Sequence, residues 1–320
     1  MTNQKVKGRF APTPSGFMHL GNIFCCLLAW LSAKAKNGSI VLRIEDLDTV
    51  RCPRKNADRL AADLEWLGLT WDEGAYTGNT SETFFQSKRF DIYKQYFEKL
   101  QAQKFVYPCF CSRNELHAVN APHLSDGRLI YPGTCYRLSL TERLEKEKNR
   151  RPAYRLHVPD KDIIFTDGNY GPQTFNLAKE NGDFIVRRSD GVYAYQLAVT
   201  VDDALMGITE VVRGWDLLSS SPLQIYLYSL LGFKTPSFTH IPLLVAPDGR
   251  RLAKRDHDKD LEILKQQYSS PEPIIGYLAY LAGQLNKPEP ITAVDLLKIY
   301  NPSFIPTHNV VVPSQLPKLS

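Results

Sequence analysis

The sequence places a histidine and an asparagine at the start of a long apolar segment, directly after a turn rich in proline and glycine. His19 and Asn22 end the stretch RFAPTPSGFMHLGN, in which an apolar run over residues 6–11 precedes the turn. This order predicts a strand, a rigid loop and a helix over residues 23–36. A helix N-terminus with polar side chains favours an anion, so the stretch is typical of a phosphate site. A plain βα turn is the alternative, but it leaves both polar side chains unexplained.

A second group of charged residues lies where the sequence predicts strand ends. The run IVLRIE predicts a buried strand over residues 40–45, and strand alternation places Arg43 and Glu45 on one face. Arg213 ends another predicted strand. Ligands of doubly wound sheets bind beyond the carboxyl ends of the strands, so these charges are candidates for binding a charged substrate. A structural ion pair between Arg43 and Glu45 is the alternative.

Three cysteines flank one polar loop. Cys109 and Cys111 precede the loop and Cys135 follows it. Sulfur ligands at both ends of a loop are typical of a structural zinc site, which stabilises a small unit that lacks its own core. The candidates for a fourth ligand are His117, His123 and Tyr131. Generic zinc chemistry favours a histidine, and three unliganded core cysteines are the alternative to any metal.

Composition places the chain among ordinary globular proteins. Its 320 residues are 43% hydrophobic and 23% charged, with a net charge of +5 that permits a nucleic-acid partner without requiring one. No apolar segment is long enough to cross a bilayer, and the N-terminus lacks the apolar core of a signal peptide. We therefore expect a cytoplasmic protein with no membrane partner. The six cysteines are then free thiols or metal ligands rather than disulfides.

The pattern of elements divides the chain into four parts. Residues 1–105 and 188–247 alternate between strands and helices and form the two halves of a parallel sheet. Residues 106–187 are rich in β signals and are predicted to be an insertion, and residues 248–320 form a basic loop and a helical region. The stretch FIVRRSDGVYAY predicts a hairpin, which puts Tyr195 on a strand. Gly232 is predicted to end a helix.

The opening stretch has a partner near residue 250. HLGN at residues 19–22 and RLAKR at residues 251–255 resemble the HIGH and KMSKS signatures of class I aminoacyl-tRNA synthetases. RFAPTPSGFMHLGN followed by LRIEDLD is similar to the glutamyl and glutaminyl branch, and the resemblance runs from Arg9 to about Lys265. It implies an α/β fold: a class I synthetase Rossmann-type parallel sheet with an inserted zinc-containing α+β subdomain and a short C-terminal helical region.

The resemblance also implies a reaction and the residues that carry it. L-Glutamate attacks the α-phosphate of ATP, which is brought with Mg²⁺, so catalysis consists mostly of positioning and charge stabilisation. The implied catalytic residues are His19, Asn22 and Lys254, and with Gly21 they bind ATP. Ala253 replaces the serine that the family pattern has beside this lysine. The implied glutamate-binding residues are Arg9, Phe10, Ala11, Pro12, Thr13, Glu45, Tyr195 and Arg213. The arginines suit the acidic side chain, and Glu45, helped by Thr13, suits the ammonium group.

The short chain and its Cys-x-Cys…Tyr-x₃-Cys insertion resemble the glutamyl-Q tRNA(Asp) synthetases within this branch. That resemblance implies one structural zinc ion, with Tyr131 as its fourth ligand beside Cys109, Cys111 and Cys135. It also implies activation of glutamate without tRNA and transfer to the queuosine base at the wobble position of tRNA(Asp). A standard glutamyl-tRNA synthetase carries a C-terminal anticodon-binding domain, and we expect this chain to end before one. We further expect a monomer.

Three other functions fit parts of the same pattern. A truncated glutamyl-tRNA synthetase would charge a tRNA 3′ end. A catalytically silent paralogue would only bind RNA, although both signature loops are nearly intact. A small-molecule ligase of the same nucleotidyl-transferring superfamily is disfavoured by the zinc-type insertion and the glutamate-type contacts.

Overall fold

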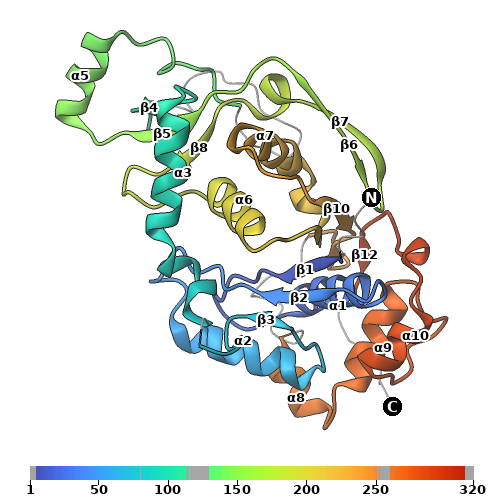
Figure 1. The fold of residues 1–320 in the computed structure, drawn as a ribbon. Coiled ribbons are helices and arrows are strands. Elements are labelled where there is room, and N and C mark those ends of the chain that lie inside the picture. The colour runs from blue at the N-terminus through green and yellow to red at the C-terminus, as the bar shows by residue number, and fades with distance from the viewer. Residues whose placement is uncertain are drawn as a thin grey trace.

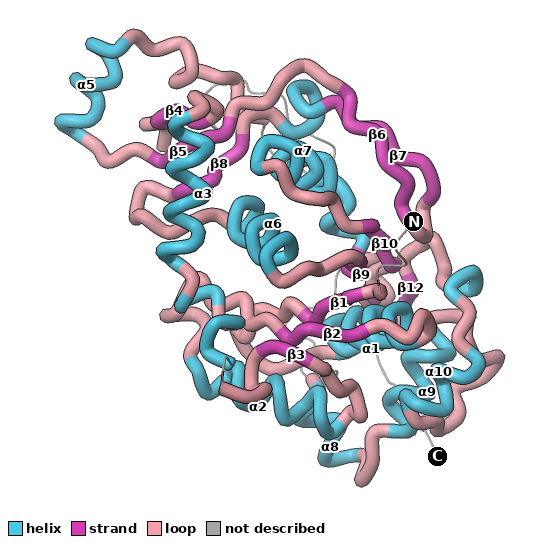
Figure 2. Tube along the Cα trace, viewed as in Figure 1, coloured by secondary structure: helices cyan, strands magenta, loops and turns pink. Residues whose placement is uncertain are grey.

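A short parallel sheet at the N-terminal end of the chain carries the loop from which the site is built. The structure is a computed structural model that describes residues 5–79, 81–112, 115, 130–250, 252 and 260–313. Strands β1 (Lys7–Phe10), β2 (Ser39–Leu42) and β3 (Glu73–Gly74) pair in parallel in the order β1-β2-β3. Figures 1 and 2 show them at the centre of the molecule, with α1 (Leu20–Lys34) packed along β1 and β2.

Helix α1 begins three residues earlier than the sequence predicts. His19 is its N-cap, and the Nδ1 of that ring accepts a bond from the Gly21 backbone N–H at 3.1 Å. The side-chain oxygen of Asn22 in turn accepts from the His19 backbone N–H at 3.2 Å. These bonds satisfy two donors at the helix start, so the two polar residues that mark the motif also fix where the helix begins.

The second half of the sheet lies beside β1. Strand β9 (Glu210–Gly214) pairs in parallel with β10 (Ser237–Ile241), and the Thr209 backbone N–H donates to the Lys7 carbonyl at 2.9 Å. Helices α6 (Tyr195–Leu205) and α7 (Ser221–Leu231) precede and follow β9. Gly232 ends α7 in the left-handed conformation, with φ of 74°, as predicted.

The region predicted as an insertion is divided between two sheets. Strands β4 (Val106–Cys109), β5 (Ala153–Leu156) and β8 (Phe184–Arg187) form an antiparallel sheet. The hairpin of β6 (Asp162–Asp167) and β7 (Gly171–Asn176) instead extends the sheet of β9 and β10, in the order β7-β6-β10-β9. Only the β6–β7 hairpin of this region therefore pairs with the sheet of β9 and β10 among the described strands. The boundaries at 1–105, 106–187, 188–247 and 248–320 stay predictions.

The predicted hairpin after β8 is only partly present. The Arg188 N–H donates to the Val192 carbonyl at 2.8 Å and Gly191 has φ of 94°, so the turn forms. Its second arm is a single bridge between Arg187 and Tyr193. The prediction that Tyr195 lies on a strand is wrong: Tyr195 is the first residue of α6. The apolar face of that helix packs into the core between α3 and α7, and this packing outweighs the local β signal.

The C-terminal region of the described chain packs against α1. Helices α9 (Glu272–Leu281) and α10 (Ala293–Ile299) contact it and share its core (Figure 1). Strand β12 (Val310–Val311) pairs with β11 (Leu244–Val245), a contact that the sequence did not predict. The remaining helices are α2 (Arg54–Trp66), α3 (Phe90–Ala102), α5 (Leu140–Asn149) and α8 (Leu261–Gln267). Short helical turns cover 81–84, 86–88, 177–181, 215–220 and 302–304.

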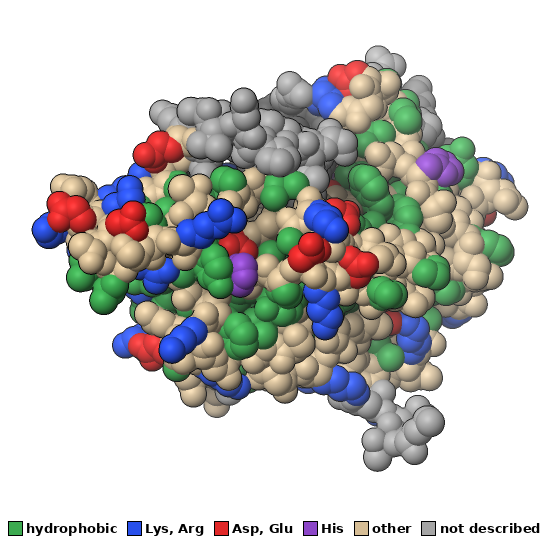
Figure 3. Space-filling model, turned by 90° about the horizontal axis from the view of Figure 1, so that it is seen from above, with side chains coloured by type: hydrophobic (Ala, Val, Ile, Leu, Met, Phe, Trp, Pro, Cys, Tyr) green, Lys and Arg blue, Asp and Glu red, His purple; other side chains and the backbone are tan. Residues whose placement is uncertain are grey.

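Charged side chains are mixed on the visible surface. On the face drawn in Figure 3, basic and acidic side chains lie interspersed rather than gathered into one large patch of a single sign. Among the described helices, none combines the length and apolar character that a bilayer span needs. The cytoplasmic location and the monomeric state stay predictions.

Candidate active site

The loop between β1 and α1 forms one wall of a cavity of about 680 Å³. The opposite walls come from Glu45 after β2, from Tyr195 at the start of α6 and from Arg213 near the end of β9. This size suits a small-molecule ligand. Every described residue of the predicted glutamate set lines the cavity: Arg9, Phe10, Ala11, Pro12, Thr13, Glu45, Tyr195 and Arg213. The fold therefore brings these residues together, while the role of each stays a prediction.

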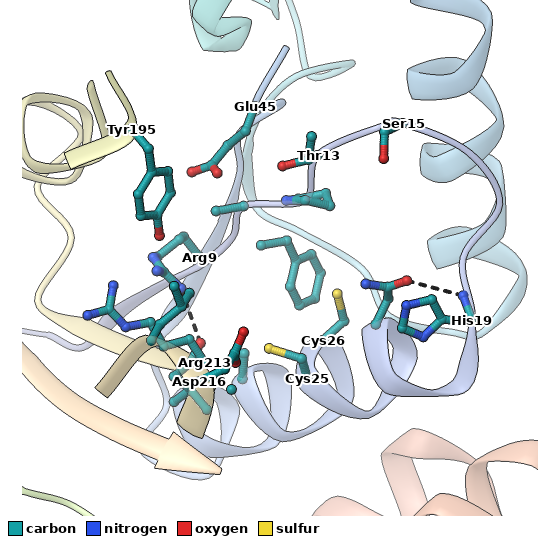
Figure 4. Close-up of a pocket in the computed structure, with 18 of the residues that line it drawn as sticks. Arg9, Thr13, Ser15, His19, Cys25, Cys26, Glu45, Tyr195, Arg213 and Asp216 are labelled. Atoms are coloured by element: carbon teal, nitrogen blue, oxygen red, sulfur yellow. Dashed lines mark hydrogen bonds between the residues drawn. The ribbon is translucent and has the colours of Figure 1, made fainter. Parts of the chain in front are cut away.

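The cavity has two chemically different ends (Figure 4). Arg9, Glu45 and Tyr195 point into the same space at one end, and His19 lies at the other. Asn22 lines the cavity beside His19, and Gly21 lines an adjoining cavity of about 320 Å³. Lys254, together with Ala253 and the rest of the KMSKS-like loop except Leu252, lies outside the described residues.

Two buried guanidinium groups face the first end. Arg9 donates from Nη1 to the Val212 carbonyl at 3.1 Å, and its Nε lies 3.5 Å from Asp203 Oδ1. Arg213 sits on β9 beside it. Burying two cations this close together is costly unless anions compensate them. A ligand carboxylate between them would provide such compensation.

Arg213 is held from three sides. Its Nε donates to His240 Nε2 at 3.0 Å, its Nη1 to Gln224 at 2.8 Å and its Nη2 to Ser221 at 2.8 Å. The parallel register of β9 and β10 places His240 directly beside it. These bonds fix the plane of the guanidinium group before any ligand arrives.

Glu45, an acidic residue at this end, is supported by Arg43. Arg43 Nη2 donates to Glu45 Oε1 at 3.1 Å, and Arg43 Nη1 donates to Asp203 at 2.6 Å. Burial raises the pKa of Glu45, and the neighbouring Arg43 and Arg9 oppose that rise. The ion pair between Arg43 and Glu45 is present, and the substrate role of Glu45 stays a prediction. Arg43 is fully buried and forms structural ion pairs, whereas Glu45 lines the cavity.

At the other end, the helix cap fixes the tautomer of His19. Because Nδ1 accepts from the Gly21 N–H, the proton of the neutral ring lies on Nε2. Nε2 is then the ring atom that donates to an anion. The N-terminus of α1 adds its partial positive charge at the same place, which makes this end suitable for phosphate.

The three predicted cysteine ligands lie together at a second site. The sulfur atoms of Cys109, Cys111 and Cys135 all lie within 4.8 Å of one another, and the Cys111 and Cys135 sulfurs are 3.5 Å apart. The hydroxyl oxygen of Tyr131 is 3.4 Å from the Cys109 sulfur and 3.6 Å from the Cys111 sulfur. His117 and His123 lie outside the described residues.

The 3.5 Å sulfur–sulfur distance and the two sulfur–oxygen distances are close to the edges of a tetrahedral zinc site. Zinc–sulfur and zinc–oxygen bond lengths place two sulfurs about 3.8 Å apart and a sulfur and an oxygen about 3.6 Å apart. Donation from Cys135 and Tyr131 and the adjacent Arg155 lower the pKa of the Cys109 thiol. The donor set thus fits a metal ion that prefers thiolate, and the group could hold one.

Sequence reasoning missed several residues that shape the site. No local pattern in the sequence marks Asp203 or His240 as part of the site. Their signal is tertiary: Asp203 reaches Arg9 and Arg43 from α6, and His240 reaches Arg213 across the strand register. Asp216 and Cys25 also line the cavity, and no local pattern marked them.

Comparisons with known proteins give one matching family and several relatives with similar sequences. Residues 5–302 match the family described as tRNA synthetases class I (E and Q), catalytic domain. A glutamyl-Q tRNA(Asp) synthetase of Symbiobacterium thermophilum is 48% identical over 311 residues, which cover 96% of each chain. A glutamate–tRNA ligase of Sulfurihydrogenibium sp. is 39% identical over 275 residues, 85% of this chain and 57% of the relative.

A solved structure extends the likeness to three dimensions. The crystal structure of a glutamate tRNA ligase from Elizabethkingia meningosepticum, in complex with its amino acid, superposes with a TM-score of 0.81 at 28% identity. The match covers 96% of this chain and 67% of that one. The predicted α/β class I fold is thereby confirmed.

Proposed function

Because the chain belongs to the class I tRNA synthetases for glutamate and glutamine, we propose that it activates L-glutamate with ATP and transfers it to the queuosine base of tRNA(Asp). The observation that carries the first step is the charge pattern of the cavity. Buried Arg9 and Arg213 complement an acidic side chain, and buried Glu45 complements an ammonium group. Glutamine would bring no negative charge to these two guanidinium groups, so the pattern favours glutamate.

Binding in this orientation directs the α-carboxylate towards the other end of the cavity. One of its oxygens bonds to the α-phosphorus of ATP, the bond to the bridging oxygen breaks, and pyrophosphate leaves with the electron pair. His19 donates from Nε2 to the phosphates, beside Asn22 and the N-terminus of α1. Lys254 is proposed to neutralise the pyrophosphate, and Mg²⁺ to accompany ATP.

The second step needs a nucleophilic hydroxyl on the acceptor. That hydroxyl attacks the acyl carbon of the adenylate, loses its proton and displaces AMP. The choice of acceptor rests on the relatives. Identity is higher to the protein named glutamyl-Q tRNA(Asp) synthetase, at 48%, than to the one named glutamate–tRNA ligase, at 39%. The first match also extends over nearly the whole of both chains.

We propose that the cysteine cluster holds one structural zinc ion. Cys109, Cys111 and Cys135 would supply three thiolates and Tyr131 an oxygen. The ion would tie β4 to the loops that carry Cys111 and Cys135, in a region with a small core of its own. Its role is structural, since the residues that line the cavity of about 680 Å³ do not include this group.

Exchange between ATP and labelled pyrophosphate tests the first step. We expect exchange that depends on L-glutamate and proceeds without any tRNA, with glutamine a poor substitute. Exchange that appears only after tRNA is added would instead favour an ordinary glutamyl-tRNA synthetase. No exchange under either condition would favour the catalytically silent RNA-binding paralogue.

A further inference from the structure

A serine, a histidine and an aspartate meet in hydrogen-bonding order in the core of the protein. His240 Nδ1 lies 2.6 Å from Asp167 Oδ2, and His240 Nε2 lies 3.3 Å from the Ser221 hydroxyl. The three come from β10, β6 and α7, and each is at least 98% buried. In hydrolases, the same order of groups activates a serine nucleophile. Here a fourth residue changes what the arrangement can do.

Arg213 uses the nitrogen of His240 that would otherwise activate the serine. It donates from Nε to His240 Nε2 at 3.0 Å and from Nη2 to the Ser221 hydroxyl at 2.8 Å. The lone pair of Nε2 is therefore directed to the arginine and not to the serine proton. The arrangement is built to hold a guanidinium group rather than to attack a carbonyl.

Asp167 fixes the tautomer that this requires. Its carboxylate accepts from the backbone N–H groups of Asn169, Tyr170 and His240, which favour the ionised form. An ionised Asp167 accepts the proton of His240 Nδ1, so Nε2 is the unprotonated nitrogen. A histidine with its proton on Nε2 would point a donor at the Arg213 Nε–H, and the contact would become repulsive.

The consequence for Arg213 follows from counting its donors. A guanidinium group has five N–H groups. Nε donates to His240, Nη1 to Gln224 and Nη2 to Ser221. Within the described part of the chain, one N–H on Nη1 and one on Nη2 are therefore left for a ligand. Two such groups match the two oxygens of a carboxylate.

We propose that His240, oriented by Asp167, is a positioning residue that sets the rotation of Arg213 for the side-chain carboxylate of the substrate. This inference rests on the proposed function, because it takes glutamate as the ligand of Arg213. Asp167 belongs to the β6–β7 hairpin, so a residue of the predicted insertion helps to orient the arginine that selects glutamate.

Two substitutions at one position test the proposal. His240→Asn keeps a donor near the position of Nδ1 and removes the acceptor at Nε2, whereas His240→Gln places an amide near the position of Nε2. In glutamate-dependent ATP–pyrophosphate exchange, we expect His240→Asn to raise KM for glutamate by about tenfold to a hundredfold, the loss of one charged hydrogen bond. KM for ATP should change little, and His240→Gln should recover part of the loss. The preference for glutamate over glutamine should fall in parallel.

Ser221→Ala provides a milder variant that removes the partner of Nη2 and the 3.3 Å contact of the hydroxyl with His240 Nε2. If His240→Asn does not fold by circular dichroism and thermal melting, Ser221→Ala carries the same test, with a smaller expected rise in KM for glutamate alone. Glutamate KM and discrimination within twofold of wild type in a folded variant would overturn the inference. An equal rise in KM for ATP would also overturn it, because that is the mark of a merely structural role.

Failure of the proposed function gives a different result. A wild-type protein without glutamate-dependent exchange would overturn the proposed function, and this inference with it. An active wild type with unchanged variants would overturn the positioning role alone.

Discussion

Arg43 donates to Glu45 at 3.1 Å although Arg43 itself does not line the cavity. Its other terminal nitrogen donates to Asp203 at 2.6 Å, and Asp203 lies 3.5 Å from Arg9. One buried guanidinium thus supports the anion at the amino-acid end of the cavity and, through Asp203, one of the two cations. The electrostatics of substrate binding therefore depend on a residue that need not touch the substrate.

Replacing Arg43 should change the pH dependence of glutamate use. Glu45 must be ionised to bind an ammonium group, so binding is lost as the pH falls through its pKa. Burial raises that pKa and Arg43 lowers it, so Arg43→Gln should move the acid limb of kcat/KM for glutamate to higher pH. Arg43→Lys, which keeps a charge, should shift less. Superimposable acid limbs in folded variants would contradict the account.

The helix cap and the phosphate contact of Asn22 can be separated. Asn22→Asp keeps an oxygen to accept from the His19 N–H but brings a negative charge towards the phosphates, whereas Asn22→Ala removes the cap bond. We expect Asn22→Ala to lower the unfolding free energy by about 1 kcal/mol and Asn22→Asp to retain it. Both variants should lower kcat for pyrophosphate exchange, the aspartate more strongly. Thermal melts and exchange kinetics measure the two effects, and a fully active Asn22→Asp variant would show that this end does not bind phosphate.

Metal analysis tests the zinc site directly. The purified protein should carry about one zinc ion per chain, because three cysteine sulfurs and the Tyr131 oxygen together offer the four donors of a closed structural site. Cys111→Ser should lose most of the metal and melt at a lower temperature. Cys52→Ser is the matched control, since Cys52 is a buried cysteine outside the cluster. The zinc site would be contradicted if wild-type protein from zinc-supplemented cells contained no metal and a chelator left its melting temperature unchanged.

Tyr131 is a sharper test of the ligand set. Its hydroxyl also accepts from the Cys135 backbone N–H at 2.8 Å, so it has a structural role even without metal. Tyr131→Phe should weaken zinc binding by about tenfold to a hundredfold in competition with a chromophoric chelator, by analogy with loss of a supporting group at metal sites. Tyr131→His offers a replacement ligand and should bind more tightly than the phenylalanine variant. Equal zinc affinity in wild type and Tyr131→Phe would show that Tyr131 is not a zinc ligand and that its hydroxyl only accepts the hydrogen bond from Cys135.

The local parts of the site were predictable from sequence. The β1 loop and the start of α1 are contiguous, so the turn residues and the polar cap at His19 and Asn22 mark them directly. Glu45 and Arg213 were found because strand ends have a fixed place in parallel sheets. The three cysteines were predicted as metal ligands because cysteine sulfurs at both ends of one loop are typical of a structural zinc site.

The remaining parts depend on contacts between distant segments. Asp167 and His240 meet through the pairing of β6 with β10, which no local pattern encodes. Tyr195 was placed on a strand because its neighbours have β propensity, yet packing of α6 against α3 and α7 makes it helical. The family resemblance implies Tyr195 as a glutamate contact whatever element carries it, and Tyr195 does line the cavity.

Transfer of labelled glutamate to tRNA(Asp) is the most direct test of the central claim. Two preparations are compared, one carrying queuosine and one lacking it, both with an intact 3′ end. The account predicts glutamate incorporation into the queuosine-containing tRNA and none above background into the other. Equal incorporation into both would place the glutamate at the 3′ end and contradict the proposed acceptor.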